Sequence, residues 1–246
     1  MAELTTYSTD GRIARLAFNR PDKRNALSFD LLTELLGRLD EIRADTDVSV
    51  VVLTGEGRSF CAGMDLKAVL HEPGAPRRLL DAIAEFTIGL RTLPAVVVAR
   101  VNGAAIGGGC GIAATCDISV THPEAKLGFP EVDLGVCPAV VAPWLVQATG
   151  AGRARRILMQ GGTLSGLRSY ELGIISECVP VEQLDARVDE IAQGLSAAGP
   201  EALRATKRLL SEMESDIYEQ VRRGAAVSAE VIAGPEAQER LAQLYA

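Results

Sequence analysis

Ser59-Phe-Cys-Ala-Gly-Met-Asp65-Leu66 and Asn102-Gly-Ala-Ala-Ile-Gly-Gly-Gly-Cys-Gly111 are the two stretches that decide the fold of this 246-residue chain. Each follows an apolar run and carries glycines where a strand would turn into a helix. Turns of this kind expose backbone N–H groups. Placed side by side, the two turns would point two N–H donors at one oxygen atom. That arrangement is an oxyanion hole, which suits chemistry through an enolate.

Strand and helix patterns alternate around these two stretches, which indicates an α/β fold. Because ligands of open α/β sheets bind beyond the carboxyl ends of strands, both turns lie where a site is expected. The expected elements are a hairpin over 3–19 turning at Thr9-Asp10-Gly11, a helix over 29–44 after the N-cap Ser28, buried strands at 48–53, 95–101 and 116–121, and a second helix, carrying Leu79, Ile83, Phe86 and Leu90, that Pro94 ends.

The chain changes character from about residue 181 onward, where only helical patterns remain. One helix carries Val188, Ile191 and Leu195 and is broken at Gly199-Pro200, and another follows it. We therefore expect a core over 1–195 that holds the site, and a helical region over 196–246 that makes oligomer contacts or a lid.

Composition excludes several classes of function. A net charge of −7 and an aromatic content of 4% argue against a nucleic-acid surface, which needs a basic face and stacking side chains. No apolar run approaches the ~18 residues of a membrane span. Five cysteines without CxxC spacing, and no signal peptide, predict reduced thiols in a cytoplasmic protein.

The two histidines, His71 and His122, lie in polar or proline-flanked segments, where we expect solvated loop residues. The sequence therefore predicts no metal site, and no Ser-His-Asp triad can be assembled from it.

Two local motifs each admit two interpretations. The Gly107–Gly109 turn is either a nucleotide loop or a tight turn, but Ile112 breaks the GxGxxG pattern and no Gly-Lys-Ser/Thr follows. Glu131, in an apolar segment after Pro130, is either a proton-transfer group whose pKa the apolar setting raises, or a first-turn helix residue.

Two basic clusters are similarly ambiguous between phosphate contacts and solvated turns. One follows the first strands and comprises Arg20, Lys23 and Arg24; the other comprises Arg153, Arg155 and Arg156.

Taken together, the motifs resemble those of the enoyl-CoA hydratase/isomerase (crotonase) family along essentially the whole chain. The matching pieces are Asn19-Arg-Pro-Asp-Lys-Arg-Asn-Ala-Leu27, Phe60-Cys-Ala-Gly-Met-Asp-Leu66, Asn102 to Gly109, Cys116-Asp117, Pro130-Glu131 and Gly173-Ile-Ile to Pro180. The resemblance implies a spiral of ββα units with a C-terminal helical region that builds trimers, often paired into hexamers. It also implies an acyl-CoA thioester as substrate and no further cofactor.

The resemblance assigns roles to particular residues. Met64 and Gly108 supply the N–H groups of the oxyanion hole, and Glu131 is the acid/base. Residues that would contact or flank the CoA moiety are Lys23, Arg24, Ala26, Ala62, Asp65, Leu66 and Lys67. The segment Ala68–Arg78 is expected to border the acyl pocket.

The chain departs from the family pattern at one catalytic position. Family hydratases typically use two glutamates, and the second position is Gly111 here. Asp133, Cys110 and Cys116 are candidates for a substitute group. The leading interpretation is an enoyl-CoA hydratase. The alternatives are an enoyl-CoA isomerase, a hydratase of branched methylglutaconyl-type substrates, indicated by Gly111, Cys137-Pro138-Ala139 and Pro143, and a non-catalytic acyl-CoA binding protein.

Overall fold

The expected hairpin opens the fold. Strands β1 (Thr5–Asp10) and β2 (Ile13–Phe18) pair antiparallel in the computed structural model, which describes residues 3–69, 72 and 74–245. Strand β2 then begins a parallel ladder, so that the six-stranded sheet has the order β1-β2-β3-β5-β7-β10. The remaining strands of this sheet are β3 (Val50–Gly55), β5 (Val96–Arg100), β7 (Ile118–Thr121) and β10 (Glu177–Cys178).

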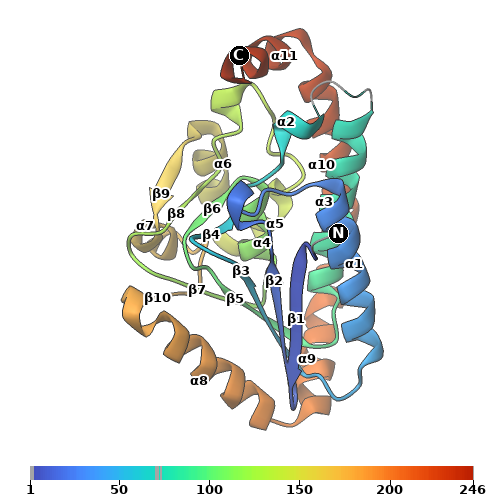
Figure 1. The fold of residues 1–246 in the computed structure, drawn as a ribbon, viewed down its shortest axis with the longest axis vertical. Helices are drawn as coiled ribbons and strands as arrows, with labels where there is room; N and C mark the ends of the chain where they lie inside the picture. Colours follow the sequence, from blue (N-terminus) through green and yellow to red (C-terminus); the bar gives the residue numbers. More distant parts are fainter. Residues whose placement is uncertain (1–2, 70–71, 73, 246) are drawn as a thin grey trace.

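Short strands after each long one build a second sheet, in the order β4-β6-β8-β9. They are β4 (Ser59–Cys61), β6 (Ala104–Ile106), β8 (Lys126–Gly128) and β9 (Thr163–Ser165). Strands β3, β5 and β7 are each followed by a strand of the second sheet and then by helix, so the ββα unit repeats along the chain. This repetition, which Figure 1 shows from one side, confirms the expected spiral.

Helices cover both sheets. The helix expected over 29–44 is α1 (Phe29–Ala44), and Ser28 Oγ accepts from the backbone N of Leu31 at 3.3 Å, as an N-cap does. The others are α2 (Leu66–Val69), α3 (Ala75–Arg91), α4 (Gly108–Thr115), α5 (Ala142–Thr149), α6 (Ala151–Gln160), α7 (Gly166–Glu171), α8 (Leu184–Ala197), α9 (Pro200–Met213), α10 (Asp216–Ala233) and α11 (Pro235–Tyr245), with 3-10 turns at Pro21–Lys23, Val132–Leu134 and Val181–Gln183.

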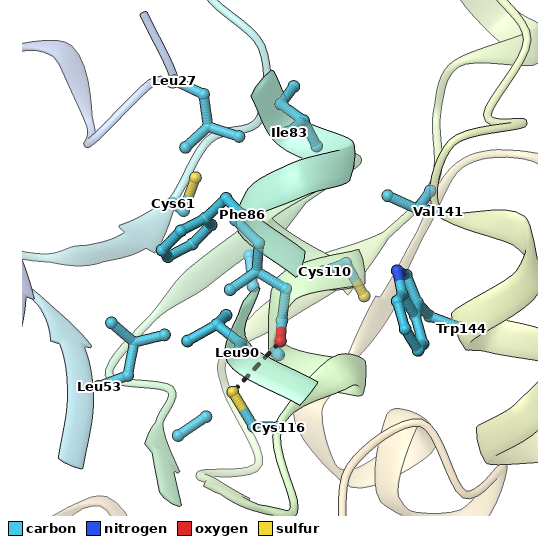
Figure 2. Packing of buried hydrophobic residues seen from close by; sticks show 14 of the residues in the cluster. Leu27, Leu53, Cys61, Ile83, Phe86, Leu90, Cys110, Cys116, Val141 and Trp144 are labelled. Carbon is cyan, nitrogen blue, oxygen red and sulfur yellow. Dashed lines mark hydrogen bonds between the residues drawn. The ribbon is translucent and has the colours of Figure 1, made fainter. Parts of the chain in front are cut away.

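The central strands β3 and β5 of the six-stranded sheet are buried on both faces, which explains their continuous apolar sequences. In β3, Val51 and Leu53 pack into the main core with α1 and α3, whereas Val50 and Val52 pack into a smaller cluster with α8. Figure 1 shows α8 on its own along one side of this sheet. Figure 2 shows the main core from close by, including Phe86 of α3.

The C-terminal helices fold back on the core. Helix α10 packs against α3 and α5. Helix α9 is tied down by the buried Lys207, whose Nζ lies 2.6 Å from Asp117 Oδ2 and 2.8 Å from the carbonyl oxygen of Ala95. Asp117 Oδ2 also accepts from the N–H of Val97. Asp117, which belongs to one of the family-like motifs, therefore joins a helix to the sheet.

The structure corrects the expectation for His122. It is buried at the end of β7, with Nδ1 3.0 Å from Glu124 Oε2, instead of solvated. Its backbone is covered by α7, because a Cβ on Gly166 would lie 2.0 Å from the His122 carbonyl oxygen. His71 lies outside the described residues, as does part of the segment 68–78. In the described part of the chain, no helix combines the length and apolar character that a membrane crossing requires.

Candidate active site

The first glycine turn leaves one backbone donor without an acceptor among the described residues. Gly63 adopts a φ of +84°, a region that favours glycine, between β4 and α2. The N–H of Leu27 donates to the Gly63 carbonyl at 2.8 Å, and the N–H of Asp65 donates to the Leu27 carbonyl at 2.9 Å. These two hydrogen bonds form a β-bridge between Leu27 and Met64, and neither of them uses the N–H of Met64. That donor is therefore available to another acceptor.

The second turn presents its donor beside the first. Gly108 is the first residue of α4, so its N–H has no acceptor within the helix. A Cβ on Gly63 would lie 2.6 Å from the Ile106 carbonyl oxygen and 3.6 Å from Gly108 N, so the two turns are in contact. Gly109 packs even more closely against Cys61, because a Cβ on Gly109 would lie 2.2 Å from the Cys61 carbonyl oxygen. The two expected oxyanion-hole residues, Met64 and Gly108, are therefore neighbours.

A mostly apolar cavity of about 90 Å³ opens beside these turns. Ala62, Met64, Leu66, Gly108 and Glu131, all singled out from the sequence, line it together. The other lining residues are Gly63, Leu80, Ile83, Ile106, Gly107, Pro130, Leu134, Val136, Cys137, Pro138, Val140 and Ile232.

Glu131 brings the one carboxyl group to the described lining of this cavity. It begins the 3-10 turn Val132–Leu134, and its carboxylate rests on Gly107, where a Cβ would lie 2.7 Å from Oε1. The other oxygen, Oε2, is buried without a hydrogen-bond partner among the described residues. Burial raises the pKa of Glu131 from its ordinary 4.5 to about 7, with a smaller contribution from Asp133, while a bond from its own backbone N–H opposes the rise. Such a group gives and takes a proton near neutral pH.

The raised pKa of Glu131 also predicts how folding stability depends on pH. The folded state binds this proton more tightly than the unfolded state does. The stabilisation that results is therefore complete below pH 4.5 and is lost as the pH rises through about 7. At 1.36 kcal/mol per pH unit, wild type should lose up to about 3 kcal/mol relative to Glu131→Gln between pH 4.5 and pH 7. Urea unfolding of both proteins at pH 5 and pH 8 measures this loss. An unchanged difference would show that Glu131 titrates normally.

The space beside Gly111 is occupied by a side chain from another segment. A Cβ on Gly111 would lie 2.3 Å from Val141 Cγ1, and Val141 is completely buried before α5. Figure 2 shows Val141 near Cys110, on the side of α4 that also faces Trp144. A side chain at 111 would lean toward the helix N-terminus, but Val141 occupies the space that its Cβ would need.

None of the three groups considered as substitutes for a second glutamate lines the described cavity. Cys110 and Cys116 are buried, and burial raises the pKa of each thiol, that of Cys116 to about 12. Asp133 is exposed, and its Oδ2 accepts from the N–H of Gly162 at 2.9 Å. Cys137 does line the cavity, but burial raises the pKa of its thiol as well.

The first basic cluster lies against the first glycine turn. Arg20 Nη2 lies 3.1 Å from Asp65 Oδ2, and the N–H of Ala62 donates to the Arg24 carbonyl. Ala26 is half-buried between them, and Lys23 and Arg24 are exposed at the rim. The fold thus gathers most of the residues expected to contact CoA.

Asn25 holds this basic turn, a role that no expectation from the sequence assigned to it. It is completely buried with a φ of +56°, and its side chain donates to the carbonyl oxygens of Glu56 and Ser59. The residue type itself is the signal for such a turn, because asparagine adopts a positive φ more readily than most other residues do.

Other expected residues lie apart from the cavity. Lys67 is exposed on α2. The second basic cluster, Arg153, Arg155 and Arg156, is exposed on α6 and contributes nothing to the described lining. No cluster of His, Cys, Asp or Glu that could hold a metal ion occurs within residues 3–69, 72 and 74–245.

Comparison with known proteins finds similar sequences and structures. A sequence profile described as enoyl-CoA hydratase/isomerase matches residues 8–240. The chain is 31% identical to the 2,3-dehydroadipyl-CoA hydratase of Escherichia coli over 87% of this chain and 84% of the relative. It is 32% identical to the short-chain-enoyl-CoA hydratase of Clostridium acetobutylicum, over 85% and 81%. The crystal structure of an enoyl-CoA hydratase from Mycobacterium avium superposes with a TM-score of 0.89 at 28% identity, covering 100% of this chain and 97% of the other.

Proposed function

This chain belongs to the enoyl-CoA hydratase/isomerase family, and we propose that it hydrates the double bond of an enoyl-CoA thioester. The observation that carries the proposal is the buried Glu131 carboxyl on the same cavity as the Met64 and Gly108 turns. The relatives named as hydratases support the same activity.

The proposed mechanism uses the thioester carbonyl as an electron sink. Its oxygen accepts from the N–H groups of Met64 and Gly108, each stabilising the developing enolate by about 3 kcal/mol. Glu131 takes a proton from a water molecule, which adds to the β-carbon. The protonated Glu131 then returns that proton to the α-carbon. A pKa near 7 suits one carboxyl to both steps.

Double-bond isomerisation is the second candidate, and the packing at position 111 favours it. With Val141 against Gly111, the described cavity has a single carboxylate. One carboxylate suffices to remove a proton from the α-carbon of a 3-enoyl thioester and return it to the γ-carbon, which needs no bound water.

The two other interpretations have less support. A glutaconyl-type substrate carries a distal carboxylate, and the described cavity lining offers it no cationic side chain. A non-catalytic acyl-CoA binder has no need of a buried carboxyl without a hydrogen-bond partner, because such burial costs free energy.

Binding of the CoA portion is proposed at the rim formed by the first basic cluster. Exposed Lys23, Arg24 and Lys67 would meet phosphates, which explains how a protein of net charge −7 holds an anionic substrate. Ala26, Ala62 and Leu66 would contact the pantetheine arm. Asp65 would act by holding Arg20 in place.

Assembly and location also remain proposals. The helical region 196–246 is proposed to make the contacts of a trimer or hexamer, and α9 exposes Leu209, Leu210 and Met213 to solvent in the single chain. A cytoplasmic location stays a prediction from the cysteine usage.

Proton NMR of the purified protein with crotonyl-CoA and with a 3-enoyl-CoA in D2O tests the function. We expect a 3-hydroxyacyl product from crotonyl-CoA. Migration of the double bond or α-deuteration without addition of water would establish the isomerase instead. Binding of both thioesters without any change would overturn both enzymatic proposals.

A further inference from the structure

The cavity beside Glu131 extends along helix α3 toward the end of α10. Ile83 marks the end nearest the oxyanion hole, because a Cβ on Gly108 would lie 4.0 Å from Ile83 Cδ1. Leu80, which also lines the cavity, is three residues earlier on α3 and so about 4.5 Å farther along the helix. Ile232 comes from the last turn of α10, which packs on α3. Figure 1 shows the start of α3 and the end of α10 at the same end of the molecule, next to α2.

The size of the cavity limits the acyl group that fits against the oxyanion hole. Its volume of about 90 Å³ is well below the ~150 Å³ of an apolar cavity that admits a benzene ring of six carbons. Its described lining is mostly aliphatic and carries no cationic side chain. The matching occupant is a short, uncharged acyl chain.

Ile232 is the residue that the C-terminal helices contribute to the described lining. Its side chain is completely buried, while the preceding Val231 is 38% exposed. Ile232 belongs to the main core together with Leu80 and Val140, which also line the cavity, so this wall is packed and cannot yield without loss of contacts.

We propose that Ile232 is a specificity-determining residue that limits the acyl group to about four carbons, a length consistent with so small a cavity. The proposal rests on the proposed function, because it assumes that the acyl chain enters this cavity from the oxyanion hole. In this proposal Ile232 of α10 has two roles, because it packs in the main core and also restricts the length of the acyl chain.

Ile232→Ala is the test. Shortening the side chain should open the cavity toward α10, so the ratio of kcat/KM for trans-2-octenoyl-CoA to that for crotonyl-CoA should rise at least about 10-fold over wild type. Val221→Ala is the matched control, since Val221 is completely buried on the same helix but lies outside the described cavity lining. It should lose stability without changing the ratio. Val231→Ala should change neither.

Binding measurements separate this proposal from the proposed function. Titration calorimetry with butyryl-CoA and octanoyl-CoA needs no turnover, and Ile232→Ala should raise the relative affinity for octanoyl-CoA. If that shift occurs in a protein that turns over no enoyl-CoA, the length limit stands and the proposed activity falls. If Ile232→Ala leaves both ratios unchanged, or behaves as Val221→Ala does, the proposal is overturned.

Discussion

Glu131→Gln should lower kcat for an enoyl-CoA substrate about 10³-fold while the affinity for the thioester changes little. General acid–base catalysis contributes roughly 10²- to 10⁴-fold, and a glutamine amide neither takes nor returns a proton. The substitution keeps the size of the side chain and removes the charge, so the cavity wall that Glu131 shares with Gly107 is preserved. Steady-state kinetics on both crotonyl-CoA and a 3-enoyl-CoA measure the effect on hydration and on isomerisation together.

Asp133→Asn is the matched control. Asp133 is two residues away on the same 3-10 turn, but it is exposed and accepts from the N–H of Gly162 outside the cavity. It should keep kcat within a few-fold of wild type. If Glu131→Gln keeps normal turnover, another group moves the proton, and Cys137 becomes the first candidate because it lines the same cavity.

The local elements of the fold could be predicted because their signals lie within a few residues. The cap at Ser28 and the apolar spacing after it define α1 over the predicted range. The continuous apolar runs before each glycine turn predict β3 and β5 to within two residues at each end. The four strands of the second sheet were not predicted, because three-residue strands carry too little periodicity to be recognised.

Site residues could be predicted from the sequence where they belong to a motif. They could not be predicted where the packing of distant segments places them in the site. Glu131, Met64 and Gly108 follow from motifs, and the structure brings all three to one cavity. Ile232 lies about a hundred residues later, and only the return of α10 onto α3 places it in the wall. Val141 belongs to no motif, yet its contact with Gly111 leaves no room for a side chain at position 111 unless Val141 moves. Such contacts depend on how distant helices pack, which the pattern of a single segment does not encode.

Gly63→Ala should lower kcat about 100-fold or more, because it disturbs the position of one oxyanion donor without touching the acid/base. Gly63 has a φ of +84°, and an added Cβ would come within 2.6 Å of the Ile106 carbonyl oxygen. Relief of that clash requires the two glycine turns to move apart, which displaces the Met64 N–H from the Gly108 N–H. Loss of one such donor costs roughly 10²- to 10³-fold in kcat. Kinetics should show the loss mainly in kcat, because the enolate gains more from these donors than the bound thioester does.

Gly173→Ala separates this effect from backbone strain. Gly173 has a φ of +81°, close to that of Gly63, but the nearest atom to an added Cβ is the Ala148 carbonyl oxygen at an ordinary 3.6 Å. Both substitutions carry the ~1–2 kcal/mol cost of this backbone region, and only Gly63→Ala also parts the two turns. We therefore expect Gly173→Ala to lower the melting temperature and keep kcat. Equal losses of kcat in the two variants would show that stability, and not the spacing of the donors, limits turnover. Unchanged kcat in a folded Gly63→Ala protein would remove Met64 from the oxyanion hole.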